Sequence, residues 1–354
     1  MKILFLTCGD ETFASSRTRV FQYLPYFSRQ KIPFKVLILG HSEILGQRLH
    51  YYLVLVKFIF YCFFYEVIFI QKVLFRRQVA KIFNLFFRYF NKKVVFDFDD
   101  AIYTMHNSFE GSQERRIKRI IRSNFEETAR IADLIVLENE FNKEYVKKIS
   151  SNILTITGPI DIARYFPVPS SEKETIVIGW IGSPSTTVYL DLILPVMQKI
   201  QEKHNNTIFK TIGANDIKLP NINIKQTFWN LKTEVSELHE FDIGIMPLTD
   251  DKWSQGKGGY KILQYMAIGI PVVASPVGIN SKIVLDGKTG FLAQTQEEWY
   301  LKLDYLITHS EERKKMGRCG RQIAVEEYSF DVAAPLLINS IISLAQPTSI
   351  SNMK

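Results

Sequence analysis

The sequence predicts an α/β protein with two domains of similar size, each built on a doubly wound parallel sheet. The 354 residues exceed the usual length of one domain, and short apolar runs alternate with helically spaced segments along the chain. A Pro/Ser-rich stretch at 165–171 interrupts this alternation, which starts again at Ile176. We therefore expect domains at 1–165 and 172–325, and a C-terminal helix within 326–354 that packs back towards the first domain.

The expected strands are short apolar runs that end at polar or glycine-containing loops. In the first half they fall at 2–6, 34–39, 67–70, 94–98, 133–137 and 153–156. In the second half they fall at 176–181, 207–212, 222–224, 243–246 and 272–274. Helices are expected at 19–29 and, with a basic amphipathic pattern, at 76–90. Ligands of such folds bind beyond the carboxyl ends of the strands, in loops that lead into helices.

The net charge of +8 is concentrated in the first half of the chain. Residues 1–170 hold 25 Lys or Arg and 16 Asp or Glu, a balance of +9, and residues 171–354 hold 19 and 20, a balance of −1. A basic half favours an anionic partner, either a membrane or nucleic acid. The three cysteines have no metal-ligand spacing and indicate a reducing compartment.

Tyr51–Tyr65 is apolar or aromatic except for Lys57, and Glu66 ends the run before the roughly 20 residues that a membrane span needs. The run predicts a buried helix that precedes a strand, and a helix lying on a bilayer surface is the alternative. The first apolar run breaks at Gly9 and so lacks the length of a signal-peptide core. We expect a cytoplasmic protein, with peripheral attachment to the inner face of the cell membrane as a further expectation.

The segment Gly256–Gln264 is the most informative one. Its three glycines allow a ligand close to the backbone and leave N–H groups for phosphate oxygens. A helix that begins near Gly259 adds its positive end, and Lys257 and Lys261 add charge. The amide of Gln264, one turn further on, suits a ribose hydroxyl. A flexible loop followed by an ordinary helix is the alternative interpretation.

The residues that follow resemble a known signature. Tyr265–Ala274 matches the helix and strand "A-M-A-x-G-x-P-V-V-A" of the retaining family-4 glycosyltransferases, Gly287–Leu292 is similar to their "G-x-T-G-x-L", and Asp242–Leu248 matches the strand before it. The resemblance implies the GT-B fold, in which two Rossmann-like domains face a cleft. It also implies a nucleoside diphosphate sugar as donor. Two positions depart from the family, because Gln264 and Gly256 stand where its two glutamates usually lie.

The resemblance implies that the second domain binds the donor. The predicted donor-binding residues are Gly182, Ser183, Lys257, Gly258, Gly259, Tyr260, Lys261 and Gln264. Gly182 and Ser183 lie on the first loop of that domain, where a serine either caps the next helix or binds phosphate. Relatives often carry a basic pair nearby, which this chain lacks, so Lys257 and Lys261 are expected to hold the pyrophosphate.

Two polar groups of the first domain complete the predicted site. Ser15, Ser16, Arg17 and Arg19 follow the first strand and are predicted to bind acceptor or phosphate. An N-cap with solvated arginines is the alternative. Asp97, Asp99 and Asp100 end a strand, where the family often has a His-Asp pair. Asp99 and Asp100 are therefore the predicted catalytic residues, and pairing of these carboxylates with local arginines is the alternative.

Basic side chains interleave with aromatic ones in the first domain. The basic ones are Lys72, Arg76, Arg77, Lys81, Arg88, Lys92, Lys93, Arg115, Arg116, Lys118, Arg119 and Arg122. They form either a solvated helix face or a surface for an anionic membrane. Nucleic acid is not expected as a partner, because none of its recognition motifs is present.

The predicted function is retaining transfer of a sugar to an acceptor hydroxyl, in the synthesis of a cell-surface polysaccharide or glycolipid. The expected partners are a nucleotide sugar and a glycan or lipid-linked acceptor. No cofactor and no metal are expected, since no acidic metal-binding pair lies beside the nucleotide loops. A non-catalytic nucleotide-sugar-binding protein of the same fold is the alternative, favoured by the missing first glutamate.

Overall fold

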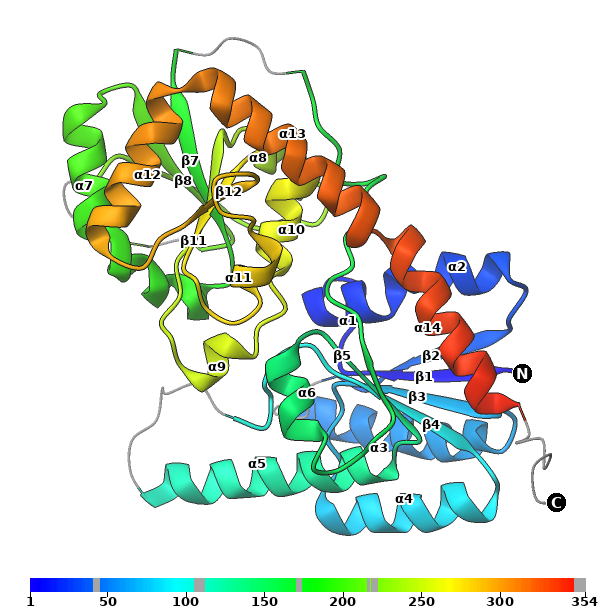
Figure 1. The fold of residues 1–354 in the computed structure, drawn as a ribbon. Coiled ribbons are helices and arrows are strands. Elements are labelled where there is room, and N and C mark those ends of the chain that lie inside the picture. Colours follow the sequence, from blue (N-terminus) through cyan, green and yellow to red (C-terminus); the bar gives the residue numbers. More distant parts are fainter. Residues whose placement is uncertain (41–44, 105–111, 170–173, 215–216, 218–221, 347–354) are drawn as a thin grey trace, which may run out of the picture. The chain divides into compact units, whose positions relative to one another are not determined.

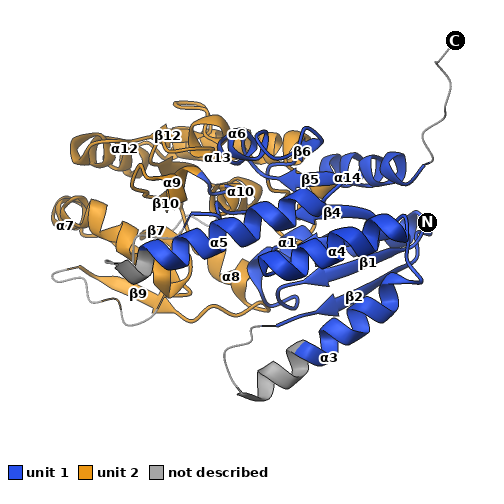
Figure 2. Ribbon diagram, turned by 90° about the horizontal axis from the view of Figure 1, so that it is seen from below, with its two compact units in different colours: residues 1–157, 256–258, 331–354 blue, residues 158–255, 259–330 orange. Residues whose placement is uncertain are grey.

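The computed structural model describes residues 1–40, 45–104, 112–169, 174–214, 217 and 222–346. The chain forms two compact units (Figures 1 and 2). The first comprises residues 1–157, 256–258 and 331–354, and the second comprises residues 158–255 and 259–330. The fold class predicted from the sequence is confirmed, because each unit is built on a six-stranded parallel sheet.

The first unit contains the sheet ordered β2-β1-β3-β4-β5-β6. Its strands are β1 (Ile3–Thr7), β2 (Phe34–Ile38), β3 (Val67–Gln71), β4 (Lys93–Asp97), β5 (Leu134–Leu137) and β6 (Ile153–Thr155). The register aligns Thr7, Gln71 and Asp97 at one edge of the sheet. The central strands are buried over their whole length, so they are apolar on both faces and end abruptly at polar residues. This edge therefore collects the polar residues of three strands.

Helices cover both faces of this sheet (Figure 1). They are α1 (Ala14–Arg19), η1 (Phe21–Tyr23), α2 (Leu24–Arg29), α3 (Leu45–Cys62), α4 (Arg77–Tyr89), α5 (Ser112–Ile131), α6 (Glu140–Val146) and α14 (Phe330–Ala345). Helices α3, α4 and α5 lie on one face, where Phe58, Phe83, Phe87 and Phe125 join the core. On the other face Phe27 of α2 meets Phe5 of β1, with ring centroids 5.5 Å apart.

The second unit contains the sheet ordered β12-β11-β10-β7-β8-β9. Its strands are β7 (Ile176–Ile181), β8 (Thr207–Ile212), β9 (Ile224–Thr227), β10 (Ile243–Met246), β11 (Val272–Ala274) and β12 (Gly290–Leu292). Its helices are η2 (Pro184–Ile193), α7 (Leu194–Lys203), α8 (Glu234–Leu238), α9 (Lys252–Gln255), α10 (Tyr260–Ala267), α11 (Asn280–Ile283), α12 (Gln296–Thr308) and α13 (Ser310–Glu327). Helix α12 begins with a capping box in which Thr295 and Glu298 each accept a backbone hydrogen bond from the other residue.

Several boundaries differ from those expected. The helix expected at 19–29 is divided into α1, η1 and α2, and Ala14–Arg19 is helical rather than a loop. The units divide after Thr157 instead of residue 165, because the side chains of Ile160 and Tyr165 are buried in the core of the second unit. The second unit likewise extends to Phe330 instead of residue 325, and residues 331–354 group with the first unit.

Candidate functional site

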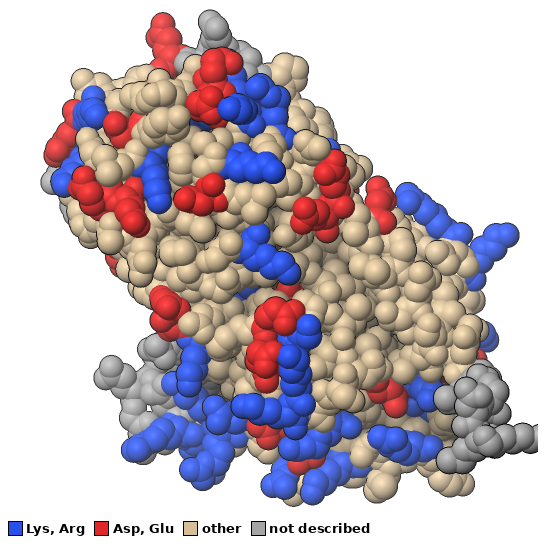
Figure 3. Space-filling model, in the orientation of Figure 1, with Lys and Arg blue, Asp and Glu red and all other residues tan. Residues whose placement is uncertain are grey.

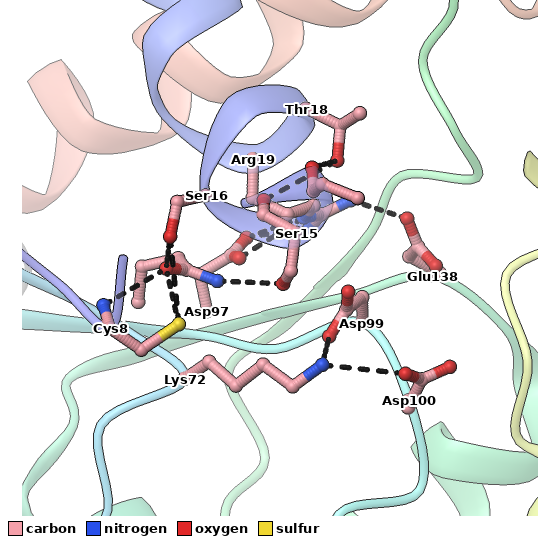
Figure 4. A network of polar contacts seen from close by, with 12 residues as sticks. Cys8, Ser15, Ser16, Thr18, Arg19, Lys72, Asp97, Asp99, Asp100 and Glu138 are labelled. Carbon is pink, nitrogen blue, oxygen red and sulfur yellow. Dashed lines mark hydrogen bonds and ion pairs between the residues drawn. The ribbon is translucent and has the colours of Figure 1, made fainter. Parts of the chain in front are cut away.

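A cluster of charged side chains lies at the carboxyl edge of the first sheet (Figure 4). Lys72 follows β3, Asp97 ends β4, Asp99 comes just after it, and Glu138 follows β5. Helix α1 lies over the same edge and contributes Arg19. Parallel strands all end at one edge, so the topology itself brings these residues together from distant parts of the sequence.

Arg19 is at the centre of a buried ion network. Its side chain is inaccessible to solvent, its Nε and Nη2 donate to the Asp97 carboxylate at 2.6–3.1 Å, and its Nη1 lies 3.2 Å from Glu138 Oε1. Nη1 also donates to the carbonyl of Ile156. Arg19 therefore holds the edge of the sheet together. These contacts disfavour its predicted role in binding a phosphate or acceptor, which stays a prediction.

Lys72 joins the two predicted catalytic carboxylates. Its Nζ lies 2.6 Å from Asp99 Oδ1 and 3.3 Å from Asp100 Oδ2. Burial alone would raise the pKa of Asp99, but the charge and hydrogen bond of Lys72 and a hydrogen bond from Ser15 outweigh it and lower the pKa to about 2. Both carboxylates remain partly exposed. Asp99 is therefore ionised, and its side chain is 16% exposed. Lys72 belongs to this cluster, not to the basic helix surface to which the sequence analysis assigned it.

Asp97 and Asp99 take different roles although both lie at the end of the same strand. β4 ends at Asp97, whose carboxylate turns inward to Arg19, whereas Asp99 lies beyond the strand and pairs with Lys72. The structural alternative of pairing with an arginine thus holds for Asp97. Asp99 and Asp100 pair with a lysine instead, at the accessible side of the cluster.

The two serines of α1 hydrogen-bond to Gln71 at the end of β3. Gln71 Nε2 donates to Ser15 Oγ at 2.8 Å, and Ser16 Oγ donates to Gln71 Oε1 at 2.9 Å. Arg17 is buried and donates to the backbone carbonyls of Glu11 and Thr12. Ser15, Ser16 and Arg17 are all buried, which disfavours their predicted contact with an acceptor or phosphate, and that contact stays a prediction. The N-cap alternative is wrong, because Phe13 precedes the helix and no side chain caps it.

Glu138 was not predicted from the sequence. Burial raises the pKa of Glu138, and the charge of Arg19 lowers it. The nearby carboxylates of Asp97, Asp99 and Asp100 raise it again, and the result is a pKa of about 8. A Cβ placed on Gly258 would come within 1.5 Å of Glu138 Oε2, so the backbone at Gly258 lies directly against this carboxyl group. A single glutamate that follows an apolar strand carries no motif, and only the three-dimensional structure shows its neighbours.

The predicted glycines 256 and 258 serve close packing within the first unit. The carbonyl of Gly256 accepts from Asn142 Nδ2 at 3.0 Å, and that of Lys257 accepts from Asn139 Nδ2 at 3.0 Å. A Cβ on Gly256 would lie 2.3 Å from Ala101 Cβ. Both glycines are thus needed where the backbone meets other protein atoms. The Lys257 side chain is half-buried.

In the second unit the first loop and the start of α10 come together. A Cβ on Gly182 would lie 2.4 Å from the Trp180 ring and 3.0 Å from Lys261 Cε. Lys261 Nζ lies 5.4 Å from the centroid of the Trp180 ring. On the other side, a Cβ on Gly213 would lie 2.4 Å from the Gly182 carbonyl oxygen. The structure thus places one cation over a glycine-lined strand end, an arrangement suited to an anion.

Helix α10 begins at this place. Gly259 precedes it with a φ of +72°, the left-handed conformation that favours glycine. Tyr260 and Lys261 occupy the first turn, whose N–H groups have no partner within a helix. Ser183 stands at the N-cap position of η2, but its hydroxyl contacts Ser185 Oγ at 3.0 Å and does not cap the helix. Capping by Ser183 is therefore wrong, and the phosphate-binding interpretation stays a prediction.

Gln264 is already engaged by the protein. Its Nε2 donates to Glu234 Oε1 at 2.8 Å and to the Tyr165 hydroxyl at 3.2 Å, and the whole group is buried. Glu234 also accepts from Trp229 Nε1 at 2.6 Å and from the Tyr165 hydroxyl. These hydrogen bonds disfavour the predicted contact between Gln264 and a ribose. Gln264 instead supplies a hydrogen bond to a buried carboxylate.

Among the described residues, no group of three or more His, Cys, Asp or Glu is arranged to hold a metal ion. The acidic side chains of the first unit are interspersed with Arg19 and Lys72. The cationic group of the second-unit loop is Lys261. These side chains and the backbone N–H groups beside them can supply hydrogen bonds and charge stabilisation.

Residues 161–323 match the family model described as glycosyl transferases group 1. The match supports that family. It spans most of the second unit and includes Gly182, Gly259, Lys261 and Gln264. None of the curated proteins matches this chain.

Solved structures show the same fold over nearly the whole chain. The structure of Alr3699/HepE from Anabaena in complex with UDP-glucose has a TM-score of 0.70 at 14% identity, covering 97% of this chain and 100% of that one. Sucrose-phosphate synthase from Thermosynechococcus elongatus has a TM-score of 0.70 at 12% identity, covering 97% and 99%. WaaG, a glycosyltransferase involved in lipopolysaccharide biosynthesis, has a TM-score of 0.67 at 13% identity, covering 94% and 99%. The chain has the GT-B fold.

Proposed function

We propose that this chain is a glycosyltransferase that moves a sugar from a nucleoside diphosphate sugar to an acceptor hydroxyl. The observation that carries the proposal is the meeting of Gly182, Lys261 and the first turn of α10, inside the segment that matches the group 1 family. Two structures of the same fold hold UDP and UDP-glucose. A diphosphate is the ligand that a helix N-terminus, a glycine loop and a lysine recognise together.

In this proposal the second unit binds the diphosphate. As the bond to the sugar breaks, negative charge grows on the leaving phosphate, and Lys261 with the N–H groups of α10 stabilises it. Lys257, which belongs to the first unit, stays a predicted phosphate ligand. No metal is required in this scheme, so turnover should be unchanged when EDTA is added and magnesium is left out.

The first unit is proposed to act on the acceptor and the transferred sugar through Asp99. Its carboxylate is ionised and partly exposed, and Lys72 fixes its position. An ionised carboxylate favours the positive charge that develops on the anomeric carbon in the transition state. Asp100 is proposed to assist from the other side of Lys72. Transfer with retention, and a glycan or lipid-linked acceptor used in cell-surface polysaccharide or glycolipid synthesis, complete the proposal.

A thermal-shift panel of UDP, GDP and ADP and their sugars tests the donor. One nucleotide should raise the melting temperature of the whole chain, since a ligand that binds only the folded state stabilises it. The same nucleotide should do much less for Lys261→Ala, and the matched control Lys315→Ala on α13 should respond like the wild type. A panel in which no nucleotide shifts the melting temperature would contradict the proposal.

A non-catalytic binding protein is the second candidate. The observation that favours it is Gly256 at the position of the family's first glutamate, where the glycine packs against Ala101. Turnover separates the two functions. If the selected nucleotide sugar binds but is never consumed in the presence of membrane lipid extract, the binding protein is the better description.

A further inference from the structure

Helices α3 and α4 expose apolar side chains on the faces that point away from the sheet. On α3 these are Tyr52, Val56 and Phe60, opposite the buried Val54, Phe58 and Cys62. A helix that packs on a soluble core normally has a polar outer face. Helix α3 is apolar on both faces of its described part, which corrects the expectation of a buried helix.

Helix α4 repeats this pattern. Ile82, Leu85 and Tyr89 are 67%, 74% and 83% exposed, while Ala80, Phe83 and Phe87 pack inward. The sequence spacing is the same on both faces, offset by two residues, so the two sets lie on opposite sides of the helix. Together Tyr52, Val56, Phe60, Ile82, Leu85 and Tyr89 are called the outer apolar surface.

Aromatic contacts connect the outer apolar side chains of α3 with those of α4. Both lie on the same face of the first sheet, and the rings of Phe58 and Phe83 meet beneath it at 5.7 Å between centroids. At the C-terminal ends of the helices, Phe63 contacts Phe90 with centroids 5.0 Å apart, and both rings are exposed. Single exposed apolar residues are ordinary, but a contiguous set over two helices indicates an interaction site.

Basic side chains predominate around the outer apolar surface. Between Val67 and Phe96 the chain has seven Lys or Arg and no Asp or Glu, and α3 has no acidic residue. Of the seven, Lys72 pairs with Asp99 and Arg77 pairs with Glu127 of α5. Lys57, Lys81 and Arg88 are exposed on these two helices. Figure 3 shows Lys and Arg gathered along the lower edge of the view, where α4 and α5 lie. This surface therefore attracts a partner that is both apolar and anionic.

We propose that the outer apolar surface docks the protein on an anionic lipid bilayer, with α3 and α4 lying in the interface. Aromatic and aliphatic side chains enter the boundary between headgroups and acyl chains, and the lysines and arginines contact lipid phosphates. Within the described residues no helix is long and apolar enough to cross a membrane. A second copy of the chain fits less well, because a symmetric interface would bring the same positive charges together.

Cosedimentation of the full chain with vesicles tests the proposal and does not depend on transferase activity. The vesicles are phosphatidylcholine alone, or phosphatidylcholine with phosphatidylglycerol, each at low and high salt. We expect binding to the anionic vesicles that weakens with salt. Leu85→Ser with Tyr89→Ser should lower the affinity by about tenfold or more. Lys81→Gln with Arg88→Gln should lower it about twentyfold at low salt, since each basic residue near the surface contributes about fivefold.

Matched controls lie on the second unit. Phe228 is 78% exposed, and Phe228→Ser should bind vesicles like the wild type. Lys315→Gln with Arg318→Gln, on the exposed side of α13, is the control for the charge pair. Thermal melting checks that every variant is folded.

Two results would overturn the proposal. One is a wild-type chain that does not sediment with anionic vesicles, or whose binding changes by less than about twofold in either double variant. The other comes from light scattering. A wild-type dimer that becomes a monomer in the Leu85→Ser, Tyr89→Ser variant would assign the surface to a second copy.

Discussion

The carboxyl edges of the two sheets differ in the residues that they carry. In the first unit this edge is dense in charge, and Arg19, Lys72, Asp97, Asp99 and Glu138 contact one another (Figure 4). In the second unit the corresponding edge has glycines and one nearby lysine, Lys261. The first edge thus carries charged side chains that pair within the protein, and the second carries backbone N–H groups beside glycines.

This difference shows how a charged side chain is stabilised at the end of a strand. A buried charge is tolerated only when it is paired, so the Asp97 carboxylate depends on Arg19. The Asp99 carboxylate lies past the end of β4, where it pairs with Lys72 and its side chain is 16% exposed. In the second unit Lys261 lies beside Gly182, 5.4 Å from the centroid of the Trp180 ring, and the proposed function has the bound diphosphate supply the negative charge. Substitutions in the ion network of the first unit should therefore lower stability. Substitution of Lys261 in the second unit should instead weaken nucleotide binding.

The largest effect is expected for Asp99→Asn. The variant keeps the shape and removes the charge that the proposed function places next to the reacting sugar, so turnover should fall by about 10²–10⁴-fold while the nucleotide still binds. Steady-state kinetics with the selected nucleotide sugar measures this. Asp133→Asn is the matched control, because Asp133 lies at the opposite end of the same sheet and accepts a hydrogen bond from the Val94 N–H. A folded Asp99→Asn variant with wild-type turnover would make Asp99 structural.

Arg19→Met should destabilise the first unit by about 3–5 kcal/mol, because it leaves the buried Asp97 carboxylate without its cation. Urea denaturation measures the free energy of unfolding. Arg29→Met is the control, since Arg29 is exposed at the end of α2. A loss below about 1 kcal/mol would show that Asp97 is not held by Arg19.

Gln264→Glu restores the family's usual residue and should nevertheless cost about 1–3 kcal/mol of stability. The new carboxylate would replace the donor that lies 2.8 Å from Glu234. Two adjacent carboxylates share a proton and have a raised pKa in the folded state, so the loss should grow as the pH rises. The control is Gln296→Glu, in the exposed first turn of α12. A Gln264→Glu variant as stable as the wild type at pH 8 would contradict these contacts.

The raised pKa of Glu138 predicts a pH-dependent stability. A carboxyl group whose folded pKa is about 8, against 4.5 when free, binds a proton more tightly in the folded state. Its contribution is present at low pH and is lost as the pH rises through this window, by up to about 1.4 kcal/mol per unit. Glu138→Gln should remove this slope, and Glu140→Gln on the neighbouring exposed position should keep it. Parallel slopes in the wild type and Glu138→Gln would refute the assignment.

Much of the fold follows from the sequence because buried parallel strands are continuous apolar runs. All the expected strands are present within one or two residues, with β9 shifted from 222–224 to Ile224–Thr227. Strand β12 was missed, since Gly290–Leu292 is three residues long and begins with a glycine. Helix α1 was taken for a loop, because its serines and threonine disfavour helix in isolation and only their buried contacts stabilise it.

The site was harder to predict than the fold. The positions of Asp99, Gly182 and Lys261 relative to their strands follow from motif and topology. The partners do not, because Arg19 and Glu138 are 119 residues apart and Gln264 and Tyr165 are 99 apart. The residue type shows that a charge or a hydrogen-bond donor is present. Only the packing determines whether that group pairs with a ligand or with another side chain.

The division of labour between the two edges is tested most directly by titration calorimetry of one nucleoside diphosphate against three proteins. The diphosphate is the one selected by the thermal-shift panel, and the proteins are the wild type, Lys261→Ala and Asp99→Asn. The account predicts that Lys261→Ala binds about tenfold or more weakly, as expected for the loss of a charge-assisted hydrogen bond, and that Asp99→Asn binds like the wild type. Equal affinity of all three proteins, or a loss in Asp99→Asn alone, would contradict it.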